Sequence, residues 1–385
     1  MSSANQPVLS EAGATRLAAI VLAAGVSSRM AEFKPMLPLA GSTALERCID
    51  VFHAAGIDEI IVVLGHRGDE LLPLAERNGA RCVGNPNFEQ GMFSSIATGC
   101  RALPNWAEAA FMLPADIPLV RASTIRHLAA VFAQQRPGVV YPVFDGRRGH
   151  PPLIARRILA EAAVEGASGP LSDLLLRHES EAINLRVVDQ GIHMDMDTLA
   201  EYDELRTLAT CREVPTRAEC EAILADRRVE TSIVLHSRVV ARVAERITNA
   251  LVRSGMTLNA ELVLAGAMLH DLAKGEPDHA AVGAGILHLM DFPQVAAIVS
   301  VHTDLDFSGD IDESAIVYLA DKLVRGEEIV TVDQRFQTAL ERFRDDPAAL
   351  SAAQKRNATV KAVAMAVETR IGVPLASVVN EAAQR

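Results

Sequence analysis

Aromatic side chains are scarce in this chain of 385 residues: phenylalanine, tyrosine and tryptophan together make up 4% of it. Hydrophobic residues still amount to 49%, so the interior has to be built mainly from alanine, leucine, valine and isoleucine. A chain of this length is longer than one hydrophobic core usually organises. We therefore expect two domains with aliphatic cores.

Basic residues are also in deficit. The 37 lysines and arginines are outnumbered by 49 aspartates and glutamates, which gives a formal net charge of −12. An excess of negative charge repels the phosphates of nucleic acid and the headgroups of anionic membranes. Neither is expected as a partner, whereas a small phosphorylated ligand needs only a local cluster of positive charge.

Long apolar runs and paired cysteines are missing as well. The apolar segment 17–25 is far too short to span a bilayer, and the residues before it lack the basic and then apolar pattern of a signal peptide. No two cysteines form a CxxC pair, which favours reduced thiols. The five cysteines are Cys48, Cys82, Cys100, Cys211 and Cys220. We expect a cytoplasmic protein with a flexible N-terminus over residues 1–15.

The first half of the chain alternates short apolar runs with amphipathic stretches. Helical spacing is found, for example, over residues 44–55 and 123–134. The apolar runs between such stretches lie at 17–22, 59–64, 110–113 and 138–143. This alternation is typical of a mostly parallel sheet that helices cover on both faces. Residues 16–208 are therefore predicted to form a doubly wound, Rossmann-like α/β domain.

After residue 197 the pattern becomes helical throughout. Thr216 and Glu219 have the spacing of a capping box that starts a helix after Pro215. Further helices are expected over 238–252, 259–272, 282–290, 293–302, 314–324 and 350–368, with no strand among them. We expect a linker or connecting helix over 209–228 and an all-α helical bundle over 229–385.

A loop rich in small residues follows the first predicted strand and carries two cations, Arg29 and Lys34. Small side chains let backbone N–H groups approach a triphosphate. The cations can neutralise phosphate oxygens and the developing charge of a pyrophosphate leaving group. The alternative is an ordinary strand-to-helix turn with surface cations. The loop begins with Leu22, Ala23, Ala24 and Gly25 and continues through Ser28.

One carboxylate, Asp116, comes directly after another predicted strand. The carboxyl ends of strands are where ligands bind in open α/β sheets. An acidic group is costly there unless it binds a metal or a hydrogen-bond donor, and Mg²⁺ that bridges phosphates is a suitable partner. The alternative is an aspartate that caps the loop.

These segments resemble the molybdopterin nucleotidyltransferases and the related, MobA-like NTP transferases of sugars and polyols. Ala24 stands where guanylyl-transferring members usually carry glycine, which favours CTP. Ala31 also replaces a usual glycine of the family. Five motifs carry the resemblance, in the family's order: LAAGVSSRM at 22–30 with Lys34, NPNFEQGMFSSI at 85–96, LPADIPLV at 113–120, RGHP at 148–151 and HMDMDT at 193–198.

The resemblance implies Mg²⁺-dependent transfer of a cytidylyl group from CTP to molybdopterin, with a molybdoenzyme as a further client. Arg29, Lys34 and Asp116 would be catalytic, and His150 would face the acceptor unless it is a loop histidine bonded locally. Mg²⁺ would be held by Asp116 with Asp195 or Asp197. The nucleotide would contact the loop residues named above, including Arg29 and Lys34, together with Gly91, Ser94, Ser95 and Asp116. A sugar, polyol or other phosphorylated acceptor is the alternative.

The helical half gathers histidines and aspartates. A lone histidine on an apolar helix face usually belongs to the core, but the His270-Asp271 pair at the end of the apolar run 262–269 is harder to explain in that way. Imidazoles and carboxylates together suit Mn, Fe, Zn or Mg. Six residues make up this set. His236 and His279 lie just before predicted helices, and the other four lie within them: His270, Asp271, His302 and Asp321.

The order of these residues resembles the HD phosphohydrolases, in particular the version with an HD-x-x-K motif, which ends here at Lys274. The resemblance implies hydrolysis of a phosphoester or phosphoanhydride by a metal-activated water. Asp271 and Lys274 would be catalytic. The minimal set of ligands would be His236, His270, Asp271 and Asp321, with His279 and His302 serving a second metal. The alternatives are a sensory HD domain and a first half that only holds and delivers a cofactor.

Overall fold

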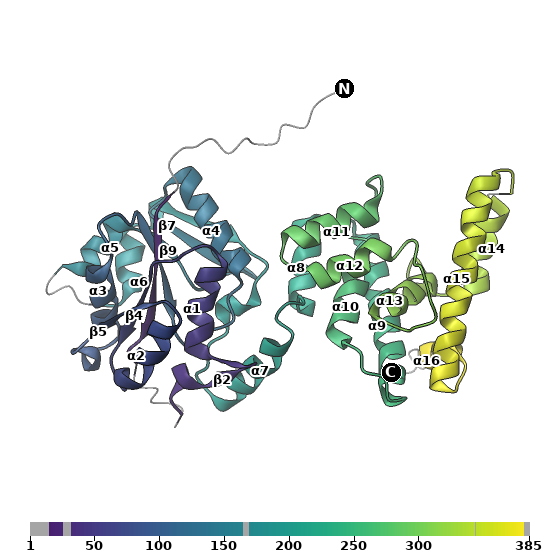
Figure 1. Ribbon diagram of the computed structural model, residues 1–385. Helices are drawn as coiled ribbons and strands as arrows, with labels where there is room; N and C mark the ends of the chain where they lie inside the picture. The colour runs from purple at the N-terminus through teal and green to yellow at the C-terminus, as the bar shows by residue number, and fades with distance from the viewer. Residues whose placement is uncertain (1–14, 26–31, 165–168, 343, 381–385) are drawn as a thin grey trace. The chain divides into compact units, whose positions relative to one another are not determined.

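The computed structural model describes residues 15–25, 32–164, 169–342 and 344–380. The predicted flexible N-terminus therefore lies almost wholly outside the described residues. The chain divides into two compact units, Met1–Thr210 and Cys211–Arg385 (Figure 1). We describe each unit by itself.

An eight-stranded sheet forms the centre of the first unit, in the order β10-β7-β9-β6-β1-β4-β5, with β8 paired to β7. The central strand β1 is parallel to β4 and to β6, whereas β9 runs antiparallel between β6 and β7. The mostly parallel α/β fold is thus confirmed, and β9 is its reversed member. The strands are β1 (Leu17–Ala23), β4 (Ile60–Leu64), β5 (Arg81–Gly84), β6 (Ala109–Pro114), β7 (Val139–Phe144), β8 (Arg147–Arg148), β9 (Leu153–Ala155) and β10 (Ala182–Arg186).

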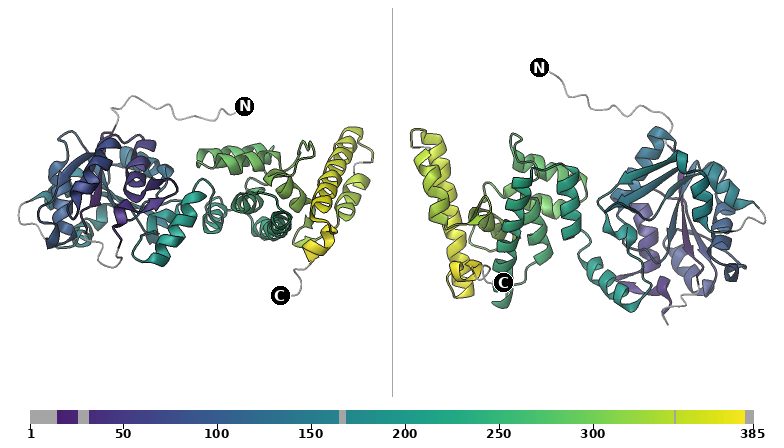
Figure 2. Two further views of the ribbon diagram at one scale, coloured as in Figure 1. Left: turned by 60° about the horizontal axis from the view of Figure 1, so that its bottom comes forward. Right: turned by 180° about the vertical axis from the view of Figure 1, so that it is seen from behind.

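Helices cover both faces of this sheet (Figures 1 and 2). Alternate residues of β1, Ala18 and Ile20, pack in one aliphatic cluster with residues of α3, α5 and α6. On the other face Phe52 of α1 meets Phe111 of β6, with ring centres 5.6 Å apart. The helices are α1 (Ala44–Ala54), α2 (Gly68–Arg77), α3 (Met92–Ala102), α4 (Ala122–Gln135), α5 (Arg156–Ala163), α6 (Leu171–Arg177) and α7 (Leu199–Thr210).

The second unit is helical, as predicted. Its helix α10 is apolar apart from Glu261 in its first turn and packs against α9, α12 and α13. Gly266 allows the close approach to α12, because a Cβ atom there would lie 2.8 Å from Ile298. The helices are α8 (Arg217–Asp226), α9 (Thr231–Arg253), α10 (Ala260–Leu269), α11 (His279–Leu289), α12 (Pro293–Val301), α13 (Glu313–Lys322), α14 (Val332–Arg342), α15 (Pro347–Ile371) and α16 (Leu375–Asn380).

The segment 209–228 contains helix α8, which starts at the predicted capping box of Thr216 and Glu219. Two details differ from the sequence-based expectation. Helix α9 begins before His236, which is therefore helical, and α11 begins at His279 itself. A short hairpin, β11 (Val324–Arg325) with β12 (Glu328–Ile329), interrupts the helices and turns at Gly326, whose φ is +62°. Strands of two residues have no periodicity for a sequence to reveal.

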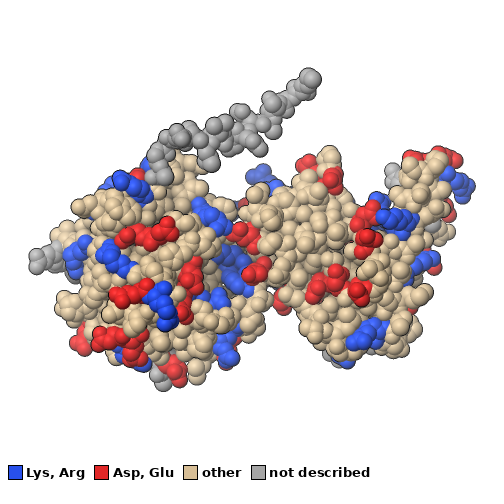
Figure 3. All heavy atoms as spheres, viewed as in Figure 1, with Lys and Arg blue, Asp and Glu red and all other residues tan. Residues whose placement is uncertain are grey.

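Charged side chains of both signs are interspersed on the face of the first unit that Figure 3 shows. The acidic side chains of the first unit therefore do not form a single acidic patch on that face. Among the described helices, none is both long and apolar enough to cross a membrane.

Candidate functional sites

The first site lies where β1 and β6 end, at the carboxyl edge of the sheet. Lys34 reaches it from a short helical turn, η1 (Lys34–Met36), and its Nζ donates to Oδ1 of Asp197 at 2.7 Å. The same Nζ lies 3.8 Å from Oδ2 of Asp116, which is the second residue after the end of β6. One lysine thus joins two of the predicted carboxylates although they are far apart in the sequence.

A cavity of about 370 Å³ opens beside this lysine. A volume of this order suits a small ligand. Of the residues predicted to bind a nucleotide, those that line it are Leu22, Ala23, Ala24, Gly25, Lys34, Gly91, Ser95 and Asp116. Ser28 and Arg29 lie outside the described residues. The cavity therefore collects the main-chain loop, the cation and the carboxylate that phosphate chemistry needs.

Ser94, which was predicted to contact the nucleotide, has local hydrogen-bond partners. It is not among the residues that line the cavity, and its hydroxyl lies 2.9 and 2.8 Å from the backbone carbonyl oxygens of Asn87 and Gly91, which share its single proton. The buried amide of Asn85 donates to Ser94 and Ser95 at 2.8 and 3.0 Å. The sequence predicted no role for Asn85, which fixes the turn that carries Gly91 into the cavity.

The carboxylates of this site are mutually unfavourable without a cation. Burial raises the pKa of Asp116, with the Lys34 ammonium acting in the opposite direction. Burial also raises the pKa of Asp195, and the charge of Asp197 adds to that effect. Carboxylates that repel one another beside this cavity fit a divalent cation such as Mg²⁺.

His150 lies in the loop between β8 and β9. Its Nδ1 is buried and has no hydrogen-bond partner, and burial lowers the pKa of the imidazole. Its backbone N–H donates to the carbonyl of Ile192 at 2.9 Å. The ring is therefore a neutral group with a free nitrogen, which suits a hydrogen bond to a polar acceptor molecule.

A fully buried aspartate that sequence reasoning missed, Asp189, organises this region. Its Oδ2 accepts from the backbone N–H of Arg121 at 2.8 Å and from the hydroxyl of Thr124 at 2.7 Å. Its Oδ1 accepts from Gly191 N–H at 3.0 Å, which starts the turn η4 (Gln190–His193) that carries Ile192. The partners on α4 lie far away in the sequence, so no local pattern marks this residue.

We expect Asp189→Asn to lower the free energy of unfolding of the first unit by about 3 kcal/mol, because both oxygens accept hydrogen bonds and the new NH₂ group must face a donor. The single tryptophan, Trp106, lies in this unit, so its fluorescence in a urea titration reports the change. The control is Asp58→Asn, whose side chain is 93% exposed and which should change the value by less than about 0.5 kcal/mol. Equal midpoints for the two variants would contradict this role of Asp189.

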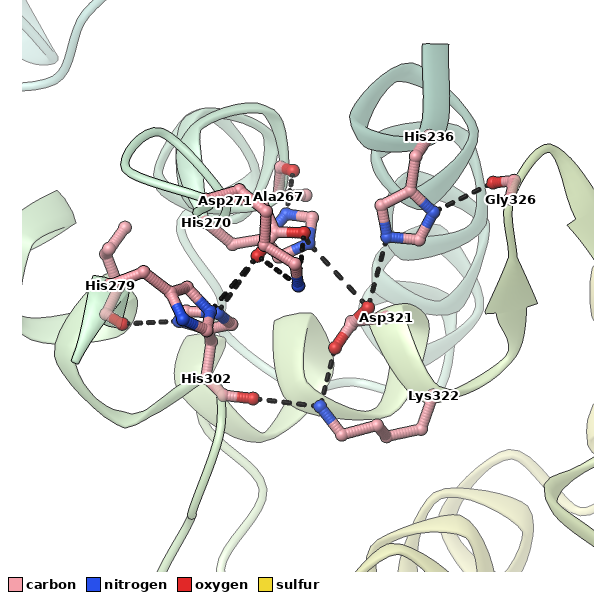
Figure 4. A network of polar contacts seen from close by, with 11 residues as sticks. His236, Ala267, His270, Asp271, His279, His302, Asp321, Lys322 and Gly326 are labelled. Atoms are coloured by element: carbon pink, nitrogen blue, oxygen red, sulfur yellow. Dashed lines mark hydrogen bonds and ion pairs between the residues drawn. The ribbon is translucent and has the colours of Figure 1, made fainter. Parts of the chain in front are cut away.

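The second site brings all six predicted ligand residues together from five helical segments (Figure 4). Their side-chain ligand atoms form two groups, each with all its atoms within 4.8 Å of one another. His236, His270 and Asp321 form the first group; Asp271, His279 and His302 form the second. The Oδ1 atom of Asp271 lies 3.4 Å from Nε2 of both His279 and His302.

Backbone carbonyls orient three of the imidazoles. Nδ1 of His236 is paired with the carbonyl of Gly326 at 2.8 Å, that of His270 with Ala267 at 2.8 Å, and that of His302 with Val299 at 2.6 Å. A carbonyl can only accept, so each Nδ1 carries a proton, and each Nε2 is turned toward a carboxylate of the site. These carbonyls, and the hairpin that supplies Gly326, were not predicted.

The Nε2 atoms of His270, His279 and His302 are buried and have no hydrogen-bond partner. Buried nitrogens without partners are costly, and these three lie beside the carboxylates of Asp271 and Asp321. Both features fit divalent metal ions bound by imidazole and carboxylate. The residues present therefore match the metal that the sequence led us to expect.

The two aspartates of this site are held ionised. Burial opposes the charge of Asp271, but the imidazoles of His270 and His302 outweigh it and hold the pKa of the carboxyl far below its ordinary value. Burial likewise opposes the charge of Asp321, and Lys322 with the neighbouring imidazoles keeps its pKa low. Lys274 is half exposed and lies 3.1 Å from the Asp271 carboxylate, at the open side of the site.

Comparison with known proteins agrees with this division. Residues 19–181 match the MobA-like NTP transferase domain, and residues 233–326 match the HD domain. Molybdenum cofactor cytidylyltransferase of Escherichia coli (strain K12) is 29% identical over 185 residues, which are 48% of this chain and 92% of that protein. A bifunctional IPC transferase and DIPP synthase of Rubrobacter xylanophilus is 39% identical over 98 residues, which are 24% of this chain and only 22% of that protein.

Among solved structures, the crystal structure of Rv0371c from Mycobacterium tuberculosis H37Rv matches with a TM-score of 0.45 and 26% identity. The match covers 51% of this chain and 99% of that one.

Proposed function

We propose that this chain, which contains a MobA-like nucleotidyltransferase domain and an HD domain, is an enzyme with two activities. The first unit transfers a cytidylyl group from CTP to molybdopterin. A phosphate oxygen of the acceptor attacks the α-phosphorus of CTP, a new P–O bond forms, and the bond to pyrophosphate breaks. The second unit hydrolyses a phosphoester or phosphoanhydride.

The observation that carries the transferase proposal is the cavity at the ends of β1 and β6, with Lys34 and Asp116 in its wall. Reactions of this kind depend on positioning and on neutralising charge. The small-residue loop would face the phosphates through its N–H groups, and Lys34 would hold pyrophosphate oxygens. Asp116, with Asp195 or Asp197, would bind Mg²⁺, which supplies charge neutralisation when bound. His150 would contact the acceptor.

The choice of CTP and molybdopterin is supported by the Escherichia coli relative, whose length is almost fully covered. The Rubrobacter xylanophilus relative, an IPC transferase and DIPP synthase, is more similar over a shorter stretch, and a different acceptor such as a sugar or polyol phosphate is therefore the alternative. Acceptor selection depends on the shape of the acceptor pocket. If CTP and molybdopterin are the substrates, we also propose that a molybdoenzyme receives the product and that the reaction takes place in the cytoplasm.

Pyrophosphate release separates these alternatives. We would incubate the chain with Mg²⁺, one nucleotide among CTP, GTP and ATP, and either carrier-bound molybdopterin or a panel of sugar and polyol phosphates. Release with CTP and molybdopterin alone supports the proposal. Release with a sugar or polyol phosphate assigns the alternative acceptor, and no release in any mixture contradicts transferase activity.

The observation that carries the hydrolase proposal is the set of buried Nε2 atoms beside Asp271 and Asp321. A bound divalent ion would lower the pKa of a water molecule and polarise a phosphoryl oxygen. The residues of this chain orient the imidazoles through backbone carbonyls, keep both carboxylates ionised, and offer Lys274 to a phosphate at the open side.

Metal removal tests this second activity. We expect chelation to abolish hydrolysis of a panel that contains nucleoside phosphates, a pyrophosphate-linked dinucleotide and p-nitrophenyl phosphate, and Mn²⁺ to restore it. Metal at a hundredfold excess over its Kd should also stabilise the second unit by about 2.7 kcal/mol, which helical circular dichroism during heating can follow. Metal binding without hydrolysis of any compound would favour a sensory HD domain.

A further inference from the structure

A buried lysine lies between the two ligand groups of the second unit. Lys322, the last residue of α13, is 8% exposed, and its Nζ lies 2.5 Å from Oδ2 of Asp321. The same Nζ donates to the backbone carbonyl of His302 at 3.0 Å (Figure 4). It also lies 4.8 Å from the centre of the Tyr318 ring. A buried ammonium is costly unless it is paired, and these three neighbours compensate it.

The two hydrogen-bond partners belong to different ligand groups. Asp321 is grouped with His236 and His270, whereas His302 is grouped with Asp271 and His279. Lys322 therefore ties a ligand of one group to the end of the helix that carries a ligand of the other. Tyr318 extends this connection, since its hydroxyl donates to the carbonyl of Arg356 on α15 at 3.3 Å.

The ammonium also divides the work of the two Asp321 oxygens. Oδ2 faces Lys322, while Oδ1 lies 3.2 Å from Nε2 of His236 and 3.7 Å from Nε2 of His270. A positive charge at this place repels an incoming metal cation. We explain the presence of the Lys322 ammonium by its effect on the orientation of Asp321, because a hydrogen bond from a residue that does not itself bind the metal fixes the geometry of a metal ligand.

We propose that Lys322 is a positioning residue for metal binding: it presents Oδ1 of Asp321 to one ligand group and fixes the position of His302 in the other. This inference rests on the proposed metal-dependent function of the second unit. Positioning and charge make opposite predictions. Loss of a positioning residue weakens metal binding, whereas loss of a repelling charge alone strengthens it.

The test is the metal affinity of Lys322→Met in the full chain. We would titrate metal-free protein with Mn²⁺ and with Co²⁺ against a competing chelator. The expected result is a loss of affinity of about 10- to 100-fold, together with a changed visible spectrum of bound Co²⁺. Lys322→Gln keeps an uncharged N–H donor, so its metal affinity should lie between that of the unaltered chain and that of Lys322→Met.

Lys361→Met is the matched control, because it also removes a lysine paired with an aspartate, Asp333 at 2.7 Å, in the same unit. It should bind metal as the unaltered chain does. Unchanged or tighter binding by Lys322→Met overturns the inference, and if that variant does not fold, the same result for Lys322→Gln does so. Failure of the unaltered chain to bind any metal overturns the proposed hydrolase site and this inference together.

Discussion

Asp271→Asn should reduce hydrolysis by the second unit by on the order of 1000-fold, since a metal-bound phosphoryl group gains several kcal/mol of stabilisation and about 4 kcal/mol corresponds to that factor. Asp271 has the largest expected effect because its two oxygens face both ligand groups: Oδ1 lies 3.4 Å from His279 and His302, and Oδ2 lies 3.5 Å from His270. Asparagine removes the charge and turns one acceptor into a donor. The measurement is kcat/KM with Mn²⁺, together with the metal retained after gel filtration.

Two comparisons make this result specific. Asp333→Asn removes a charge from an aspartate whose side chain is 81% exposed and should leave hydrolysis unchanged. Pyrophosphate release by the first unit should also persist in Asp271→Asn, because the residues of the first site that the structure describes all belong to the first unit. Full hydrolysis by the variant would remove Asp271 from the reaction.

Lys34→Met should lower the rate of nucleotidyl transfer by about 100- to 1000-fold, the cost of removing one preorganised group that stabilises developing negative charge. Lys34 is the sole lysine of residues 1–210, and it lies within 4 Å of the carboxylate of Asp116, in the cavity wall, and of that of Asp197. Methionine keeps most of the length of the side chain but neither the charge nor the donors. Single-turnover measurement of pyrophosphate release would follow the chemical step itself.

Arg77→Met serves as the matched control, since it removes a cation that is 69% exposed and 3.4 Å from Glu46. It should transfer at the unaltered rate. Trp106 fluorescence in urea would show whether Lys34→Met remains folded. A folded variant with the unaltered rate would leave Lys34 as a structural partner of Asp116 and Asp197 only.

The fold was predictable where burial alone determines the pattern. Strands β1, β4, β6 and β7 are continuous apolar runs because both faces of the sheet are covered, and such runs are visible in the sequence. Edge strands β5 and β10 were missed because they are partly exposed and mix polar with apolar residues. The three-residue strand β9 is too short to show any period, so its reversed direction could not be inferred.

The functional residues were predictable where the residue type itself carries the chemistry, as with histidine and aspartate as metal ligands. The histidines and aspartates of the HD motif were all named from the sequence, and the structure gathers them. Residues that act through distant partners were not: Asp189 contacts α4, and Lys322 contacts the His302 carbonyl 20 positions earlier. A lysine that directly follows a ligand aspartate is a signal that could have drawn attention to Lys322, but its second partner exists only in the folded chain.

Every described residue of the first site belongs to Met1–Thr210, and every ligand of the second belongs to Cys211–Arg385. In genetic language, a lesion in one site should be complemented by a second copy of the gene that is damaged only in the other. A cell with one copy carrying Asp116→Asn and another carrying Asp271→Asn would keep both reactions. Because one reading frame encodes both units, they are always made in equal numbers.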